Sequence, residues 1–186
     1  MIHTILQKIG ELSAEKSFLL VAIDGRCCAG KTSLSKKIRA NVPCNIIHMD
    51  DFFLRPEQRT EKRLKTPGEN IDHERFLPEV LLPLSQNKEF SFRPYDCKQQ
   101  TLAGAITVPA MPLTIIEGSY SCHESLRQYY DLRIFLDTDE DLQLQRIKNR
   151  NGANALDMFR NKWIPLEEAY FKAFSVRNQC ELYFKT

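Results

Sequence analysis

Hydrophobic and polar positions along the chain follow two periods in turn. Apolar residues recur with helical spacing over residues 2–12, which predicts an amphipathic helix packed along one face. Residues 18–24, FLLVAID, then form a nearly continuous apolar run that is too short for most helices. Such a run is typical of a strand buried on both faces of a parallel sheet. A second helix is expected after Gly30, with Leu34 and Ile38 on its inner side.

The same order of strand and helix returns further along the chain. Further strands are predicted at 45–48, 113–117 and 132–136, with a weaker candidate at 181–185. Alternation of this kind predicts a layered α/β fold with a parallel sheet.

A long insertion, residues 51–112, separates the second and third of these strands. It begins with a loop of mixed charge and continues with an apolar helix around residues 76–82. Its later part predicts a small hairpin, in which 90–95 pairs with 105–108.

Local signals place the remaining helices. Ser121 and Glu124 have capping-box spacing, which predicts a helix directly after the third strand. Another helix is predicted over 142–150, ending near Asn151 and Gly152, and Asn154 is the expected cap of the next. Pro165 should kink or divide that last helix.

Length and composition exclude several classes of protein. A chain of 186 residues with 42% hydrophobic residues suits one compact domain, and a net charge of +2 argues against a nucleic-acid-binding surface. No apolar run is long enough to span a membrane, so we expect a soluble, cytoplasmic protein without a membrane partner. The six cysteines show no CxxC pair and are expected to be free thiols. Whether the chain forms a homo-oligomer is left open.

A phosphate-binding motif lies between the first predicted strand and the helix that follows it. Its pattern is G-x-x-x-x-G-K-[ST], and its residues are Gly25, Arg26, Cys27, Cys28, Ala29, Gly30, Lys31 and Thr32. Backbone N–H groups and the helix N-terminus would surround phosphate oxygens, Lys31 would supply a cation, and the Thr32 hydroxyl would ligate Mg²⁺. The alternative is a glycine-rich turn with one exposed lysine. The adjacent cysteines could indicate thiol chemistry, but small space-filling residues are the favoured interpretation.

Three carboxylates follow predicted strands, where parallel strands direct them toward the nucleotide. Asp50 and Asp51 end the second strand, and one of them could take the proton of a hydroxyl that attacks the γ-phosphorus. Glu117 ends the third strand and could hold Mg²⁺ through water. The alternatives are a turn formed by the two aspartates and an ordinary strand end at Glu117.

Arg146 and Arg150 are four residues apart and so share one helix face. Guanidinium groups suit a lid, over about residues 146–160, that closes on the transferred phosphoryl group. A solvated face paired with nearby aspartates is the alternative.

Taken in order, these motifs resemble the uridine kinase family. The resemblance covers the chain from about residue 18 onward and extends to the nicotinamide riboside, phosphoribulose and pantothenate kinases. The segments that carry it are GRCCAGKT, HMDDFF, ENIDHERF, RPYD, IIEG and DTDEDLQLQRIKNR.

The resemblance implies a three-layer P-loop NTPase fold with a five-stranded parallel sheet, a helical lid and the insertion as acceptor site. It implies Mg·ATP as phosphoryl donor and a nucleoside-like hydroxyl as acceptor. Asp50 matches the catalytic base, and Ser33 extends the nucleotide-binding loop. Arg146 and Arg150 match lid arginines.

The resemblance also assigns the acceptor site to Phe53, Asp72, Arg93 and Tyr95. Asp72 matches an aspartate that holds ribose hydroxyls, although it could equally cap the following helix. Tyr95 could instead be a hydrophobic position of the hairpin.

Two departures from the family pattern bear on the acceptor. Ile71 replaces an aromatic residue and Gln100 replaces a histidine, both of which belong to base recognition in uridine kinases. Pro56 and Glu57 after DDFF resemble nicotinamide riboside kinases instead. A non-catalytic nucleotide-binding protein is the alternative from another class, and a GTPase is disfavoured because no guanine-reading N/T-K-x-D segment is present.

Overall fold

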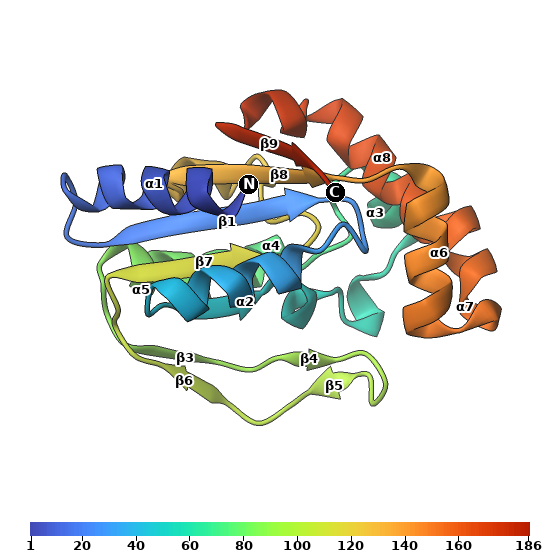
Figure 1. Ribbon diagram of the computed structural model, residues 1–186. Coiled ribbons are helices and arrows are strands. Elements are labelled where there is room, and N and C mark those ends of the chain that lie inside the picture. The colour runs from blue at the N-terminus through green and yellow to red at the C-terminus, as the bar shows by residue number, and fades with distance from the viewer.

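The computed structural model describes all 186 residues, and a five-stranded parallel sheet forms its centre (Figure 1). The strand order is β2-β7-β1-β8-β9. The strands are β1 (Leu19–Gly25), β2 (Asn45–His48), β7 (Leu113–Glu117), β8 (Leu132–Asp137) and β9 (Leu182–Lys185). All five predicted strands are confirmed, including the weaker one, and β1 is buried along its whole length in the middle of the sheet.

Two helices cover one face of the sheet. These are α1 (Ile2–Ser13) and α2 (Lys31–Asn41), both predicted from sequence. Ile5 and Ile9 of α1 pack with Leu34 and Ile38 of α2 against alternate residues of β1, β7 and β8. The period of two along the strands thus sends one set of side chains to this core.

The other face packs against the helix of the insertion and the last helix of the chain. The insertion helix runs through α4 (His73–Phe76), a π turn (Leu77–Leu81) and α5 (Leu82–Ser85), and the last helix is α8 (Ile164–Ala173). Phe76, Val80, Leu81 and Tyr170 are fully buried in this second core.

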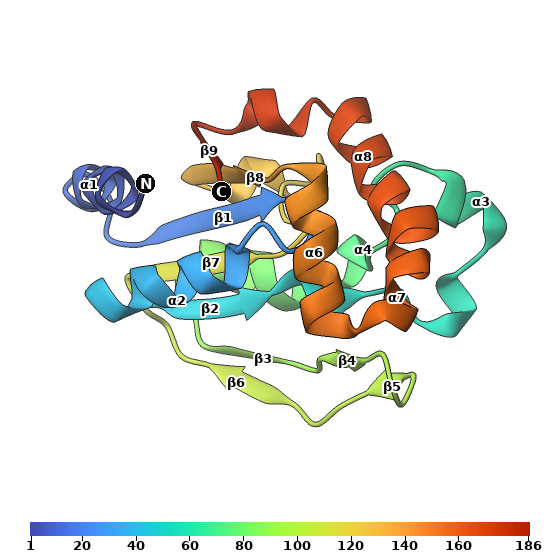
Figure 2. The ribbon, with the colours of Figure 1, turned by 45° about the vertical axis from the view of Figure 1, so that its right-hand side comes forward.

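The rest of the insertion forms short elements, among them a long hairpin that runs alongside the sheet toward the carboxyl ends of its strands (Figure 2). The predicted hairpin is confirmed, with β3 (Phe90–Phe92) antiparallel to β6 (Ile106–Val108). Beyond it, β4 (Tyr95–Asp96) pairs with β5 (Thr101–Leu102). The mixed-charge loop holds 3-10 turns at Met49–Phe52 and Pro56–Gln58 and the helix α3 (Glu61–Lys65).

The helix predicted at Ser121 is wrong. The segment after β7 is a series of turns, followed by a 3-10 turn at Arg127–Tyr129. The Ser121 hydroxyl donates to the Gly118 carbonyl at 2.8 Å, while the Tyr120 and Cys122 N–H groups donate to Asp24. The buried carboxylate of Asp24 therefore competes successfully with a local helix for these backbone donors.

The C-terminal helices confirm one prediction and correct another. Helix α6 (Glu140–Asn151) ends at Gly152, which is also the N-cap of α7 (Ala153–Met158). Asn154 lies inside α7, so its prediction as a cap is wrong. Gly152 has a positive φ of 85°, a backbone conformation that favours glycine, and α6 ends there. A π turn at Phe159–Trp163 separates α7 from α8, where Pro165 lies in the first turn, which confirms the predicted division. No helix has both the length and the apolar character needed to cross a membrane.

Candidate active site

The predicted phosphate-binding loop connects β1 to α2 at the carboxyl end of the sheet (Figure 2). Gly25 has φ 128°, and a Cβ atom there would lie 1.9 Å from the Leu136 carbonyl oxygen of β8. Only glycine fits this close approach. The pKa values of the Cys27 and Cys28 thiols are raised by burial, which favours the space-filling interpretation over thiol chemistry.

Lys31 lies within the loop rather than on its surface. Its side chain is only 8% exposed, and its ammonium donates to the Gly25 carbonyl at 2.6 Å and the Arg26 carbonyl at 2.9 Å. The Ser119 hydroxyl, on the segment after β7, lies 3.3 Å from the same ammonium. The cation is thus preplaced beside the loop amides that would surround a phosphate group.

Thr32 and Glu117 form a pair of oxygen ligands for a cation. The Thr32 hydroxyl donates to Glu117 Oε1 at 2.9 Å, and His48 Nδ1 contacts the same oxygen at 2.6 Å. A hydroxyl and a carboxylate are ligand types that Mg²⁺ prefers, so the residues fit this ion. The hydrogen bond to Glu117 raises the pKa of His48.

Asp50 lies in the 3-10 turn directly after β2, facing this group. The side chain reaches solvent, yet enough protein surrounds it that desolvation raises its pKa, an effect opposed by the charges of Lys31 and Arg150. A carboxylate of raised pKa is better suited to accept a proton at neutral pH. Asp51 also has a raised pKa because of desolvation, and its backbone carbonyl accepts a hydrogen bond from Arg75.

The two arginines of α6 occupy different environments. Arg146 donates to the Cys28 carbonyl at 3.2 Å and so lies against the phosphate-binding loop. Arg150 is exposed, donates to Asn151 and has no acidic partner, and its charge opposes the rise in the pKa of Asp50 that desolvation causes. The alternative of a face paired with nearby aspartates does not apply to either residue.

Asp72 caps α4, which is one of the two roles that its sequence position allowed. Its Oδ1 atom accepts from the Arg75 N–H at 3.2 Å and caps α4, whereas Oδ2 is buried without a hydrogen bond. The guanidinium groups of Arg55 and Arg75 each lie 3.6 Å from Oδ2. Oδ2 therefore lacks a hydrogen-bond donor but has two cationic neighbours.

The other expected acceptor residues make different contacts. Tyr95 is buried and its hydroxyl accepts from Arg59 at 3.1 Å, while Phe53 pairs with Ile71 in an isolated β-bridge. Arg93 donates to the Ala103 and Leu102 carbonyls of its own hairpin. The structure thus directs the Arg93 guanidinium to the hairpin backbone.

Asp24 is a residue of the site that the sequence reading missed. It ends the apolar run of β1 and is fully buried, where desolvation raises its pKa. Its carboxylate accepts from three backbone N–H groups and from the Tyr170 hydroxyl at 2.8 Å. It joins β1, the segment after β7 and α8 directly below the phosphate-binding loop.

Glu167 of α8 was also missed. It is buried, and it accepts from the Ser119 hydroxyl at 2.5 Å and from the Cys27 N–H at 3.0 Å. Desolvation raises its pKa while Lys31 opposes the shift, so the loop, its lysine and α8 are electrostatically coupled. An acidic residue within a partly apolar helix was the only sequence signal for it.

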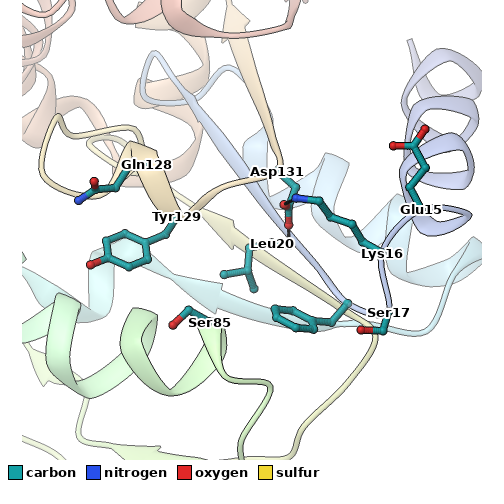
Figure 3. Close-up of a pocket in the computed structure, with 9 residues that line it drawn as sticks. Glu15, Lys16, Ser17, Leu20, Ser85, Gln128, Tyr129 and Asp131 are labelled. Atoms are coloured by element: carbon teal, nitrogen blue, oxygen red, sulfur yellow. Dashed lines mark hydrogen bonds and ion pairs between the residues drawn. The ribbon is translucent and has the colours of Figure 1, made fainter.

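One cavity of the protein lies away from this group of residues. It has a volume of about 440 Å³ and is formed near the start of β1 by residues such as Phe18, Leu20 and Tyr129, with the Lys16–Asp131 ion pair at its edge (Figure 3). Because β1 begins there and ends at the loop, the cavity and the phosphate-binding loop are at opposite ends of the sheet. This cavity is therefore not part of the group that contains Lys31 and Glu117.

Comparison with known proteins agrees with the geometry. The model of the phosphoribulokinase / uridine kinase family matches residues 20–154. A uridine kinase of Macrococcus caseolyticus is 31% identical over 138 residues, which are 68% of this chain and 66% of that protein. The matched segment thus spans just under two thirds of this curated relative.

Solved structures show the same fold at low sequence identity. A structure described as a possible uridine kinase from Bacillus stearothermophilus has a TM-score of 0.67 at 18% identity, covering 97% of this chain and 99% of that one. Phosphoribulokinase from Rhodobacter spheroides has a TM-score of 0.62 at 12% identity, covering 91% and 70%. The P-loop kinase fold and the family match together show that the chain belongs to the phosphoribulokinase / uridine kinase family, whose members are phosphotransferases acting on a hydroxyl group.

Proposed function

We propose that this protein transfers the γ-phosphoryl group of ATP to a hydroxyl of a nucleoside or a related small metabolite in the cytosol. The observation that supports the proposal most directly is the grouping of Lys31, Thr32, Glu117 and Asp50 at the ends of neighbouring parallel strands. A cation, a pair of metal ligands and a carboxylate base are the parts that phosphoryl transfer requires.

Each residue has a defined part in the proposed reaction. Lys31 and the loop amides bind the triphosphate, and Asp50 accepts the proton of the attacking hydroxyl. Arg146 and Arg150 stabilise charge on the transferred group as the lid closes. Thr32 and Glu117 would hold Mg²⁺, which supplies charge neutralisation of the phosphate oxygens when bound.

The acceptor is proposed to be held through its sugar rather than through its base. The free Oδ2 of Asp72 suits a ribose-type hydroxyl. Ile71 is fully buried and Gln100 is exposed in the turn between β4 and β5, so neither offers a base the recognition groups expected of a uridine kinase. Nicotinamide riboside, whose ring differs from the pyrimidine bases, is therefore the second candidate.

Two variants separate a kinase from a protein that only binds nucleotide. We expect Lys31→Ala and Asp50→Asn each to lower kcat/KM by at least ~10²-fold, the scale of lost charge stabilisation or base catalysis. Asp50→Asn should still bind Mg·ATP, and Asp51→Asn, a neighbouring carboxylate, is the matched control that should retain activity within a few-fold. Coupled assays with uridine, cytidine, nicotinamide riboside, pantothenate and sugars would identify the acceptor. Full activity of Asp50→Asn would refute the assigned base.

A further inference from the structure

Three potential metal ligands form a cluster outside the catalytic group. Glu69, His73 and His123 each contribute one ligand atom, and these atoms all lie within 4.8 Å of one another. Glu69 and His73 belong to the insertion, where His73 is the first residue of α4, whereas His123 lies on the segment after β7. The cluster therefore joins two parts of the chain that are distant in sequence.

His123 of this cluster has a nitrogen without a hydrogen bond. Its side chain is 3% exposed, and its Nε2 atom is buried without a hydrogen-bond partner. Buried polar nitrogens are nearly always paired, so an orphaned one calls for an explanation. A Cβ atom at Gly68 would lie 3.0 Å from this nitrogen and 2.9 Å from the Phe174 ring, so only glycine fits beside Nε2.

The second nitrogen of His123 is already oriented. Nδ1 lies 2.8 Å from the Ser125 hydroxyl and 3.4 Å from the Ser125 N–H, and metal binding at Nε2 uses the tautomer in which Nδ1–H donates to the hydroxyl. Metal-binding histidines commonly have one ring nitrogen on the metal and the other hydrogen-bonded in this way.

Glu69 and His73 complete the ligand set. His73 Nε2 lies 3.0 Å from Glu69 Oε1, a spacing compatible with two ligands on one ion, whose bonds are about 2.0–2.2 Å long. The His73 ring stacks on His123, with centroids 4.4 Å apart and planes inclined by 16°. Because an imidazole lone pair lies in the plane of its ring, binding requires one ring to turn out of the stack. His73, at 16% side-chain exposure, is less enclosed than His123.

We propose that Glu69, His73 and His123 bind a zinc-class transition-metal ion, with water in a fourth position. Two imidazoles and one carboxylate favour such an ion, whereas Mg²⁺ prefers oxygen ligands alone. Because His73 directly follows Asp72, the ion fastens the proposed acceptor segment to the segment after β7. This site is separate from the pair formed by Thr32 and Glu117.

The test uses the full chain, freed of metal by a chelator and kept in excess Mg²⁺ and ADP. Zn²⁺ binding is measured by calorimetry, and Co²⁺ is used as a spectroscopic probe of coordination. We expect one equivalent of four-coordinate Co²⁺, with affinity reduced at least about tenfold in Glu69→Gln and in His123→Phe. The phenylalanine retains aromatic contacts with His73, Tyr170 and Phe174. The control is His3→Phe on the exposed side of α1.

Glu69→Gln keeps the experiment decisive if His123→Phe fails to fold, since Glu69 is partly exposed. Absence of Zn²⁺ and Co²⁺ binding would overturn the proposal. Binding that neither variant weakens would do the same, and so would thiolate-to-cobalt charge-transfer bands, which would place the ion on cysteines. Circular dichroism of each variant confirms that a lost signal reflects a lost ligand.

Discussion

The hydrogen bond from Tyr170 to Asp24 connects the last helix to the central strand, and Tyr170→Phe removes it with little change in shape. Both residues are fully buried and the O···O distance is 2.8 Å. Asp24 retains three backbone donors in the variant. Hydrogen bonds to charged groups contribute about 1.5–3 kcal/mol, so we expect the free energy of unfolding to fall by that amount. For a chain of this size, Tm should fall by roughly 3–12 °C.

Urea unfolding of the nucleotide-free protein, followed by circular dichroism, measures the change. Tyr183→Phe is the matched control, because the Tyr183 hydroxyl also donates to an aspartate, Asp137, at 2.8 Å. That site is partly exposed and Asp137 is also held by Arg26, so the expected loss is below about 1 kcal/mol. The reasoning is refuted if Tyr170→Phe lies within about 0.5 kcal/mol of wild type, or if Tyr183→Phe costs as much.

Three further predictions follow from other contacts. Gly25→Ala places a Cβ atom 1.9 Å from the Leu136 carbonyl oxygen, so Mg·ATP affinity should be lost in titration calorimetry, and wild-type affinity would contradict the geometry. Asp72→Asn retains a good N-cap but loses the carboxylate oxygen that has no hydrogen bond. Steady-state kinetics should therefore show a higher KM for the acceptor, while the Tm and the KM for ATP stay unchanged. Equal changes in both KM values would argue against an acceptor-binding role of Asp72. The pKa of His48 is raised in the folded protein, so its bond to Glu117 stabilises the fold fully at pH values below the ordinary histidine pKa of about 6.5. This contribution is lost as the pH rises through the pKa that His48 has in the folded protein. The unfolding free energy of wild type minus that of His48→Gln should therefore decline as pH rises above about 6.5, and a constant difference would exclude the assigned pair.

Elements with strong local patterns could be predicted from the sequence. The apolar run of β1 and the helical spacing of α1 determine their burial almost without help from the rest of the chain. The phosphate-binding loop was equally clear, because its glycines and Lys31 lie within eight residues. An element whose conformation depends on residues close together in the sequence can be predicted from the sequence.

Predictions failed where a distant group decides the local conformation. Ser121 and Glu124 have the spacing of a capping box, yet the backbone near them serves Asp24, nearly a hundred residues earlier. Asn154 is a good capping residue by type, but Gly152 provides the backbone angle that the junction between α6 and α7 needs. Local propensity was outweighed by tertiary hydrogen bonding and by chain geometry.

The candidate site was predicted in part for the same reason. Asp50 and Glu117 could be proposed because each ends a strand, whereas Glu167 contacts Cys27 and Ser119 only after α8 has packed on the sheet. No periodic pattern indicates a contact between residues 140 positions apart. Asp24 was read as the end of an apolar run, and its four donors become evident only in the folded chain.

Helix α8 holds the phosphate-binding loop at three points. Glu167 accepts from the Cys27 N–H, Glu168 forms an ion pair with Arg26 at 2.5 Å, and Tyr170 bonds to Asp24 below the loop. The N-terminal end of α8, just before these contacts, is joined through the π turn to α7, which belongs to the proposed lid. Nucleotide binding and lid closure should therefore be thermodynamically linked. A ligand or substitution that favours the closed lid should increase the affinity for nucleotide, and it should do so by the same factor by which nucleotide favours closure.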